Sequence, residues 1–270
     1  MGTSQSSTGP GAGVALVPPW ADDVPPDDPT DPSADNAPDD SDQTPPREAP
    51  PARFRDTRRS LGSYARNGDS KDLRRALGHY VRSGYGGTAT MTRRLGGTAA
   101  TAGRLGTMLQ SGRTPDGASL RDAALANGSD ANAVLDAIVD TASPADGTQD
   151  KEASRLSIRN ALSDLLVRFP DADLFALTEA QRNYVIERYA ALDVYARFCL
   201  DLQKTVLDKA PDAVTGMRRL RYIREFISEQ VSESFRKIRD ENASPTTRSI
   251  AQLTRAALRE TLAVFEEYTS

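Results

Sequence analysis

The chain has 270 residues, of which 38% are hydrophobic and 6% aromatic, and its formal net charge is −4. Its single cysteine, Cys199, and single histidine, His79, exclude an internal disulfide and a Cys/His zinc cluster within one chain. The sequence has neither an apolar run long enough to span a membrane nor a secretory signal pattern at its start, which favours a cytoplasmic protein.

Residues 1–20 form an N-terminal tail without charged side chains that ends in Val17-Pro18-Pro19-Trp20, where the chain has its one tryptophan. Removal of Met1 would expose the amine of Gly2, and an α-amine with a pKa near 8 is partly neutral and nucleophilic at neutral pH. Three interpretations are open. Gly2 with Ser6 fits an N-myristoylation pattern; the tail is a disordered chain start; or it is a handle whose proline segment docks into a groove of another protein.

Residues 21–52 are interpreted as an acidic, proline-rich linker. Between residues 21 and 50 there are ten acidic side chains and one basic, a net charge of −9, and prolines recur throughout. Proline blocks helix and sheet ladders, and like charges repel, so we expect an extended, disordered spacer. About 30 residues of polyproline II at ~3.1 Å each would give the tail a reach of roughly 90 Å.

Residues 53–113 form a basic region, with thirteen basic and three acidic side chains and a net charge of +10. The spacing predicts a helix over residues 70–82, with Ser70 as N-cap and Gly84 past its end. The Gly- and Ala-rich residues 84–106 are either closely packed helices or loop. The arginines either contact nucleic acid or pair with the acidic linker or an acidic partner protein; the candidate contacts are Arg74, Arg75, Arg93, Arg94 and Arg104.

Residues 114–270 show apolar positions spaced by three and four, which predicts long helices. We predict helices over residues 119–141, over 151–168, from a Thr178–Gln181 capping box to residue 208, from Pro211 along a stripe that runs from Met217 to Ile238, and from Ser244-Pro245 onward. The expected fold is all-α, with a C-terminal bundle of long antiparallel helices preceded by a small Gly/Arg-rich helical region and a disordered tail.

No catalytic signature stands out in the sequence. His79 is expected to be structural or at the surface, and Cys199 lies on an apolar helix stripe, where a core role is expected. Ser234 and Lys237 match a Ser-x-x-Lys spacing without its companion motifs, and no nucleotide-binding loop is present. We therefore expect a chain that is not itself an enzyme and that binds no metal or cofactor.

Four motifs of the sequence carry a resemblance to a known family. They are the start Met-Gly-Thr-Ser, Leu-Val-Pro-Pro-Trp-Ala-Asp at 16–22, Ser-Tyr-Ala-Arg-Asn-Gly at 63–68 and Gly-Tyr-Gly-Gly-Thr-Ala-Thr at 84–90. Together they resemble the QatB family of bacterial Qat anti-phage defence systems. By motif the resemblance covers about the first 110 residues, and the remainder is similar in length and helical character.

This resemblance implies a setting with an ATPase, a TatD-like nuclease and a QueC-like protein, which uses ATP to make a deazaguanine nitrile. It implies that the chain is a substrate or adaptor of the QueC-like partner, on which ATP and a deazaguanine precursor are expected. Gly2 would be the modified residue, and the expected partner contacts are Thr3, Ser4, Val17, Pro18, Pro19 and Trp20. The competing hypothesis is a binding module or scaffold that links the ATPase or nucleic acid through the basic region.

Overall fold

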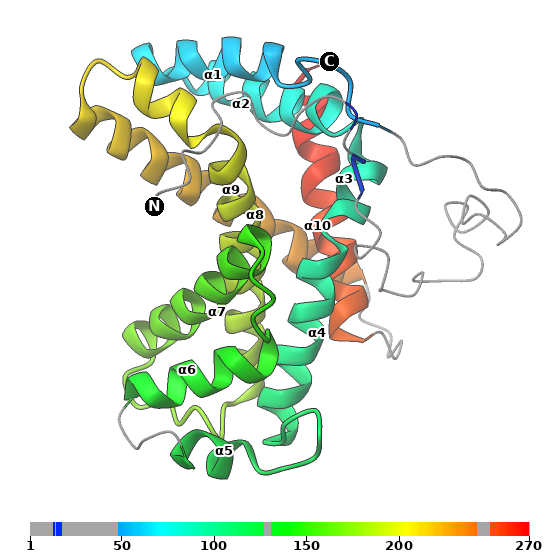
Figure 1. The fold of residues 1–270 in the computed structure, drawn as a ribbon, viewed down its shortest axis with the longest axis vertical. Helices are drawn as coiled ribbons and strands as arrows, with labels where there is room; N and C mark the ends of the chain where they lie inside the picture. Colours follow the sequence, from blue (N-terminus) through cyan, green and yellow to red (C-terminus); the bar gives the residue numbers. More distant parts are fainter. Residues whose placement is uncertain (1–12, 14, 18–47, 127–130, 242–248, 270) are drawn as a thin grey trace, which may run out of the picture. The chain divides into compact units, whose positions relative to one another are not determined.

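Figure 1 shows the fold of the computed structural model, which describes residues 13, 15–17, 48–126, 131–241 and 249–269. These residues form α-helices and a short π-helix, and β-type pairing among them is limited to two isolated bridges, Ala15–Glu48 and Arg113–Ser119. The prediction of an all-α protein is confirmed. The elements in chain order are α1 (Arg55–Asn67), α2 (Ser70–His79), η2 (Tyr80–Gly84), α3 (Thr88–Arg94), α4 (Gly96–Ser111), α5 (Leu120–Ala126), α6 (Ala131–Ala142), α7 (Gln149–Arg168), α8 (Glu179–Lys209), α9 (Ala213–Glu241) and α10 (Ile250–Glu267).

The chain divides into two compact units that interleave along the sequence. Unit 1 comprises residues 1–97, 198–226 and 255–270, and unit 2 comprises residues 98–197 and 227–254. Each of the helices α8, α9 and α10 begins in one unit and ends in the other. The division by composition into segments 53–113 and 114–270 stays a prediction.

Unit 1 is built around aromatic side chains. The side chains that are at most 2% exposed include Phe54, Tyr64, Tyr80, Tyr85, Phe198 and Phe265. Burying one such ring contributes about 2–3 kcal/mol, so this small set supplies much of the driving force for the unit. Helices α2 and α10 also pack closely in this unit, because a Cβ added to Gly78 of α2 would lie 3.0 Å from the Phe265 carbonyl oxygen on α10.

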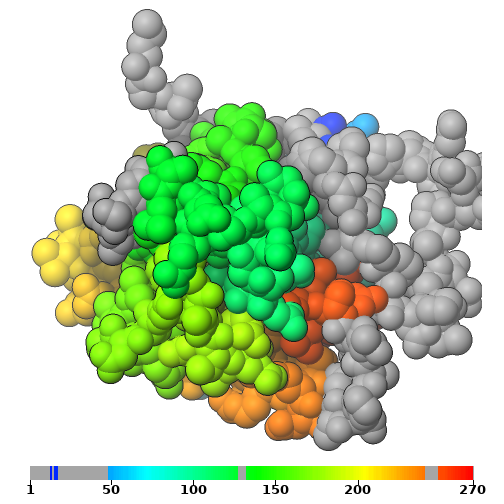
Figure 2. All heavy atoms as spheres, turned by 90° about the horizontal axis from the view of Figure 1, so that it is seen from below, coloured from blue at the N-terminus to red at the C-terminus, as the bar shows by residue number. Residues whose placement is uncertain are grey.

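Unit 2 packs α4 closely against the start of α10 through glycine. A Cβ on Gly103 would lie 2.9 Å from the Cβ of Ala251, and one on Gly106 would collide with Ile250. The Gly- and Ala-rich segment is therefore closely packed helix rather than loop. In the space-filling view of Figure 2, residues 113–126 and 131–142, in green, lie beside the segment from α7 into α8, in yellow-green. There Arg121 of α5 stacks over the Phe175 ring, with Cζ 4.9 Å from the centroid.

Several helix starts follow the predicted capping logic. Thr178 and Gln181 exchange reciprocal hydrogen bonds of 2.8 and 3.3 Å between side chain and backbone, so the capping box of α8 is confirmed. Ser119 accepts from the Asp122 amide at 3.3 Å at the start of α5, as expected of a cap. The single helix predicted over 119–141 is two helices, α5 and α6.

Other helix starts differ from the prediction because an aspartate or a later serine provides the cap. Asp69, not Ser70, caps α2 by accepting from the Lys71 amide at 2.8 Å. Asp212, not Pro211, precedes α9 and accepts from the Thr215 amide at 2.8 Å. Helix α10 begins at Ile250, after a Ser249–Gln252 capping box, whereas the predicted start at residues 244–245 lies outside the described residues.

The predicted apolar stripe of α9 is buried from Leu220 to Phe235, but Met217 is 60% exposed and that assignment was wrong. In the first turn of α9 the inward positions belong to Thr215 and Gly216 instead. A Cβ on Gly216 would lie 3.1 Å from the Leu207 side chain, so α9 and the end of α8 meet through the glycine and leave Met217 outside.

Candidate functional site

The apolar end of the N-terminal tail is docked on unit 1. The Gly13 amide donates to the Ala49 carbonyl oxygen at 3.2 Å, and Ala15 forms an antiparallel bridge with Glu48. Leu16 is 2% exposed and Val17 is half-buried. An uncharged tail segment can be buried in this way because its side chains carry no charge to desolvate and the Gly13 amide has a backbone partner. We call residues 13–17 with 48–49 the tail anchor.

The tail anchor changes the expected role of the acidic linker. Because Ala15 and Glu48 are paired, the described residues on either side of the linker, 15–17 and 48–49, lie together in the tail anchor. The linker therefore does not set the distance between tail and body, and the expected reach of roughly 90 Å does not apply. Of the tail residues predicted to act, Val17 lies in the anchor; Gly2, Thr3, Ser4, Pro18, Pro19 and Trp20 lie outside the described residues.

A second feature of unit 1 is a cluster of aromatic residues around Asp201. The hydroxyl groups of Tyr80 and Tyr85 donate to the same Asp201 Oδ2 at 2.8 and 2.6 Å. The two rings meet edge to face with centroids 5.2 Å apart, and Phe198 meets Tyr80 with centroids 5.6 Å apart. Hydrogen bonds to a carboxylate are stronger than those between neutral groups, so Asp201 ties the end of α2 to α8.

Local backbone geometry brings the two tyrosines together. Helix α2 continues as the π-helix η2 from Tyr80 to Gly84, and the wider π turn places residues five apart on the same side. Gly84 packs against the Phe54 ring, where a Cβ would come within 2.6 Å of Cε1. The Gly-Tyr-Gly-Gly-Thr motif thus serves this cluster, which its sequence alone did not reveal.

The same motif also holds α10 in place. Gly87 has φ +103° and caps α3, and the following residue, Thr88, donates to Glu266 Oε2 from its amide at 2.9 Å and from its hydroxyl at 2.6 Å. A Cβ on Gly87 would lie 3.3 Å from Glu266 Oε1. The backbone conformation therefore requires glycine at this position, and a Cβ would also crowd the Glu266 carboxylate.

Two arginines from the start of α1 lie against the same aromatic cluster. The Cζ atoms of Arg53 and Arg58 lie 4.5 and 6.0 Å from the Phe54 ring centroid. Burial lowers the pKa of the Arg58 guanidinium, and the negative charge of Asp201 opposes that shift. Sequence analysis did not single out Asp201, because its partners Tyr80 and Tyr85 lie more than a hundred positions away in the chain.

The predicted basic contacts are distributed over both units. In unit 1, Arg74 places its Cζ 5.8 Å from the Tyr268 ring centroid, and Arg75 makes a surface ion pair with Asp72 at 3.8 Å. Arg93 is exposed, and Arg94 is half-buried. In unit 2, Arg104 donates to the Ala142 carbonyl oxygen at 3.1 Å, so part of its donor capacity is used inside the fold.

Unit 2 has its own buried polar network. The Thr98 hydroxyl donates to Asp193 Oδ2 at 2.6 Å, Ser154 and Tyr189 share a hydrogen bond of 2.7 Å, and Arg197 pairs with Asp150. Burial raises the pKa of Asp193, while the Thr98 hydrogen bond and the Arg197 charge oppose the shift. Burial also raises the pKa of Tyr189 well above its ordinary value. Apart from Arg197 Nε, which is buried without a hydrogen-bond partner, these groups bond to one another, which is typical of a structural network.

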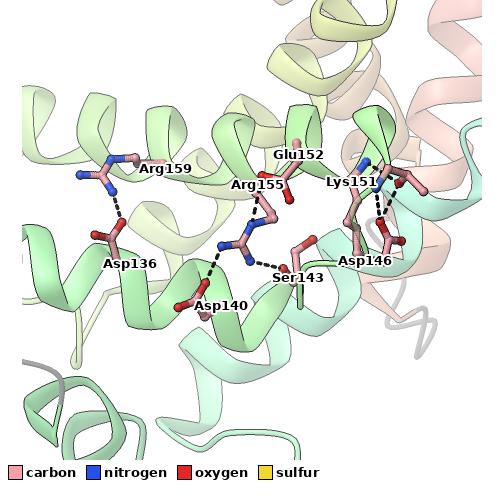
Figure 3. A network of polar contacts seen from close by, with 9 residues as sticks. Asp136, Asp140, Ser143, Asp146, Lys151, Glu152, Arg155 and Arg159 are labelled. Carbon is pink, nitrogen blue, oxygen red and sulfur yellow. Dashed lines mark hydrogen bonds and ion pairs between the residues drawn. The ribbon is translucent and has the colours of Figure 1, made fainter. Parts of the chain in front are cut away.

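At the surface of unit 2, charged residues join α6 to α7. Figure 3 shows Arg155 and Arg159 of α7 pairing with Asp140 and Asp136 of α6, and Arg155 also donates to the Ser143 carbonyl oxygen at 2.6 Å.

In the part of the chain that the structure describes, no group of His, Cys, Asp and Glu is arranged to hold a metal ion. His79 and Cys199 are both half-buried, and the described helices include none that is long and apolar enough to cross a membrane.

Comparison with known proteins identifies the family. A family model described as Qat anti-phage system associated protein QatB matches residues 86–265, which is 180 of the 270 residues. Curated proteins and solved structures give no match. The match covers Gly86, Gly87 and Thr88 of the motif, Asp201 and most of the helical body, whereas the tail motifs that first carried the resemblance precede it. The chain thus belongs to the QatB family and is a component of a Qat anti-phage defence system.

Proposed function

We propose that this chain acts without chemistry of its own, as the protein substrate of a QueC-like partner that modifies the Gly2 amine. The observation that supports this most directly is the tail anchor, in which Gly13 is bonded to Ala49 and Leu16 is buried. Gly2 and Gly13 are eleven positions apart, so at ~3.5 Å per residue the amine lies at most about 40 Å from a fixed point on unit 1. A partner that binds unit 1 would thereby keep the Gly2 amine within reach of the partner's active site.

The chemistry of the step is amide formation. The partner would use ATP to convert a deazaguanine carboxylate into an acyl adenylate with release of pyrophosphate. The neutral Gly2 amine would attack the acyl carbon, AMP would leave, and the amine proton would pass to solvent. An N-terminal glycine suits this attack because it has no side chain beside its amine, and ATP and the deazaguanine would both be bound by the partner.

The experiment is co-expression of the full chain with the QueC-like partner, followed by mass analysis of the N-terminal peptide. We expect Gly2 to gain the mass of the deazaguanine acyl group. An unmodified Gly2, while the partner still releases pyrophosphate from ATP, would refute the proposal.

Paired variants test whether the tail anchor presents the amine. Leu16→Asp places a charge at a side chain that is 2% exposed, whereas Leu156→Asp makes the same change on α7 at one that is 58% exposed. We expect a lower modified fraction for L16D and an unchanged fraction for L156D. Equal fractions in both variants would show that the anchor has no role in presentation.

A further inference from the structure

Residues 53–58 of unit 1 contain four buried polar atoms that have no hydrogen-bond partner. They are Arg53 Nε, Thr57 Oγ1, Arg58 Nε and Arg58 Nη2. Nearly all buried donors in proteins have a partner, because each unsatisfied group costs about 1–3 kcal/mol. Such a concentration in one helix start indicates that an acceptor from outside the described residues completes it.

The two atoms of Arg58 define the shape of that acceptor. Nε–H and the neighbouring Nη2–H form one edge of the guanidinium, and their bonds point in parallel. This is the edge that pairs with two oxygens of a carboxylate or phosphate at once. The Arg58 guanidinium lies over Phe54, which is itself stacked on Tyr80 with centroids 5.7 Å apart.

The charges of the cluster also favour an anion. Arg53 and Arg58 contribute two positive charges, and Asp201 contributes one negative charge. The Asp201 carboxylate accepts from the hydroxyls of Tyr80 and Tyr85, and its charge acts on Arg58 although Arg58 Nε and Nη2 have no hydrogen-bond partner. One bound anion would therefore neutralise the cluster and satisfy the Arg58 edge together.

We propose that the Arg58 edge, with Arg53 and Thr57 beside it, is a binding site for a single oxyanion group. The oxyanion has two possible sources. One is an aspartate of the acidic linker, whose last residues lead directly into Arg53. The other is a free phosphate compound. This site does not depend on modification of Gly2, and the two proposals are tested by separate experiments.

The first arm of the test measures thermal unfolding of the full chain by circular dichroism, with inorganic phosphate titrated against chloride at equal ionic strength. If free phosphate is the ligand, the midpoint temperature rises and saturates as expected for a ligand that binds the folded state. The rise should disappear in Arg58→Gln and persist in Arg59→Gln, a neighbouring exposed arginine that serves as the matched control. Arg58→Lys keeps the charge but loses the parallel edge, so its affinity should fall at least about tenfold.

The second arm replaces all nine aspartates between residues 22 and 42 by asparagine. If the linker supplies the oxyanion, this chain melts at a lower temperature than the wild type and gains a response to phosphate. The same replacements in the R58Q background should then have no further effect. The proposal is overturned if phosphate shifts none of the chains and the linker replacements act equally with and without Arg58.

Discussion

The backbone of Ala15 pairs with that of Glu48, so two points 33 positions apart in the sequence meet on the surface of unit 1. The residues that flank the acidic segment are therefore held together at the tail anchor. For a flexible loop the closure free energy grows only slowly with length, by about 0.6 kcal/mol per doubling. Burial of Leu16 and the Gly13–Ala49 hydrogen bond are the contacts that offset this cost.

Hydrogen exchange can test the tail anchor without any partner. The Gly13 amide is bonded to the Ala49 carbonyl oxygen, so we expect it to exchange more slowly than an unstructured glycine amide. Leu16→Asp should bring its exchange close to the unstructured rate, because a buried carboxylate would undock the segment. Leu156→Asp should leave the exchange of Gly13 unchanged, and fast exchange in the wild type would contradict the anchor.

Asp201 should contribute more to stability than another acidic residue of the same helix. In Asp201→Asn the two tyrosine hydroxyls keep an oxygen acceptor but lose its charge, so we expect a loss of about 2 kcal/mol in the free energy of unfolding. Asp208 pairs with Lys204 at 3.1 Å on the surface, and Asp208→Asn should cost less than about 0.5 kcal/mol. Urea unfolding followed by circular dichroism measures both; equal losses would argue against the cluster.

The conformation of Gly87 should make it much less tolerant of alanine than Gly112. Gly87 has φ +103° and ψ 171°, a region open to glycine alone, and faces Glu266. Gly112 has φ +65°, in the left-handed helical region, with no atom near its Cβ position. We expect Gly87→Ala to cost about 3 kcal/mol and Gly112→Ala about 1 kcal/mol. Thermal unfolding midpoints give the comparison, and the reverse order would be inconsistent with this geometry.

Asp193 should make stability depend on pH in the opposite sense to a surface aspartate. Its folded pKa is raised above the ordinary 3.8 by burial, so the folded state holds the proton more tightly than the unfolded state. Stability from this group is therefore present below pH 3.8 and is lost as pH rises through the raised folded pKa. Asparagine at this position cannot ionise and still accepts from Thr98. Relative to wild type, Asp193→Asn should gain stability from pH 4 to 7 in urea unfolding series; a constant difference would rule this out.

Local patterns in the sequence predicted many elements correctly because they depend on neighbouring residues. The Thr178–Gln181 capping box and the buried stripe from Leu220 to Phe235 are both confirmed, since each follows from spacings of three and four along one helix. The errors arose where two residues could serve the same local role. Asp69 caps α2 in place of Ser70, and Gly216 takes the inward position expected of Met217.

The sequence by itself determined the helical class, the family resemblance and the presence of an uncharged tail followed by an acidic segment, because each is written in composition, short motifs or helical periodicity. Only the tertiary structure decided that Leu16 is buried beside Glu48 and Ala49, and that Arg58, Tyr80, Tyr85 and Asp201 share one cluster. The members of these groups come from separate helices more than a hundred residues apart, or from either side of a long acidic segment. Their meeting depends on long-range packing that no local spacing encodes.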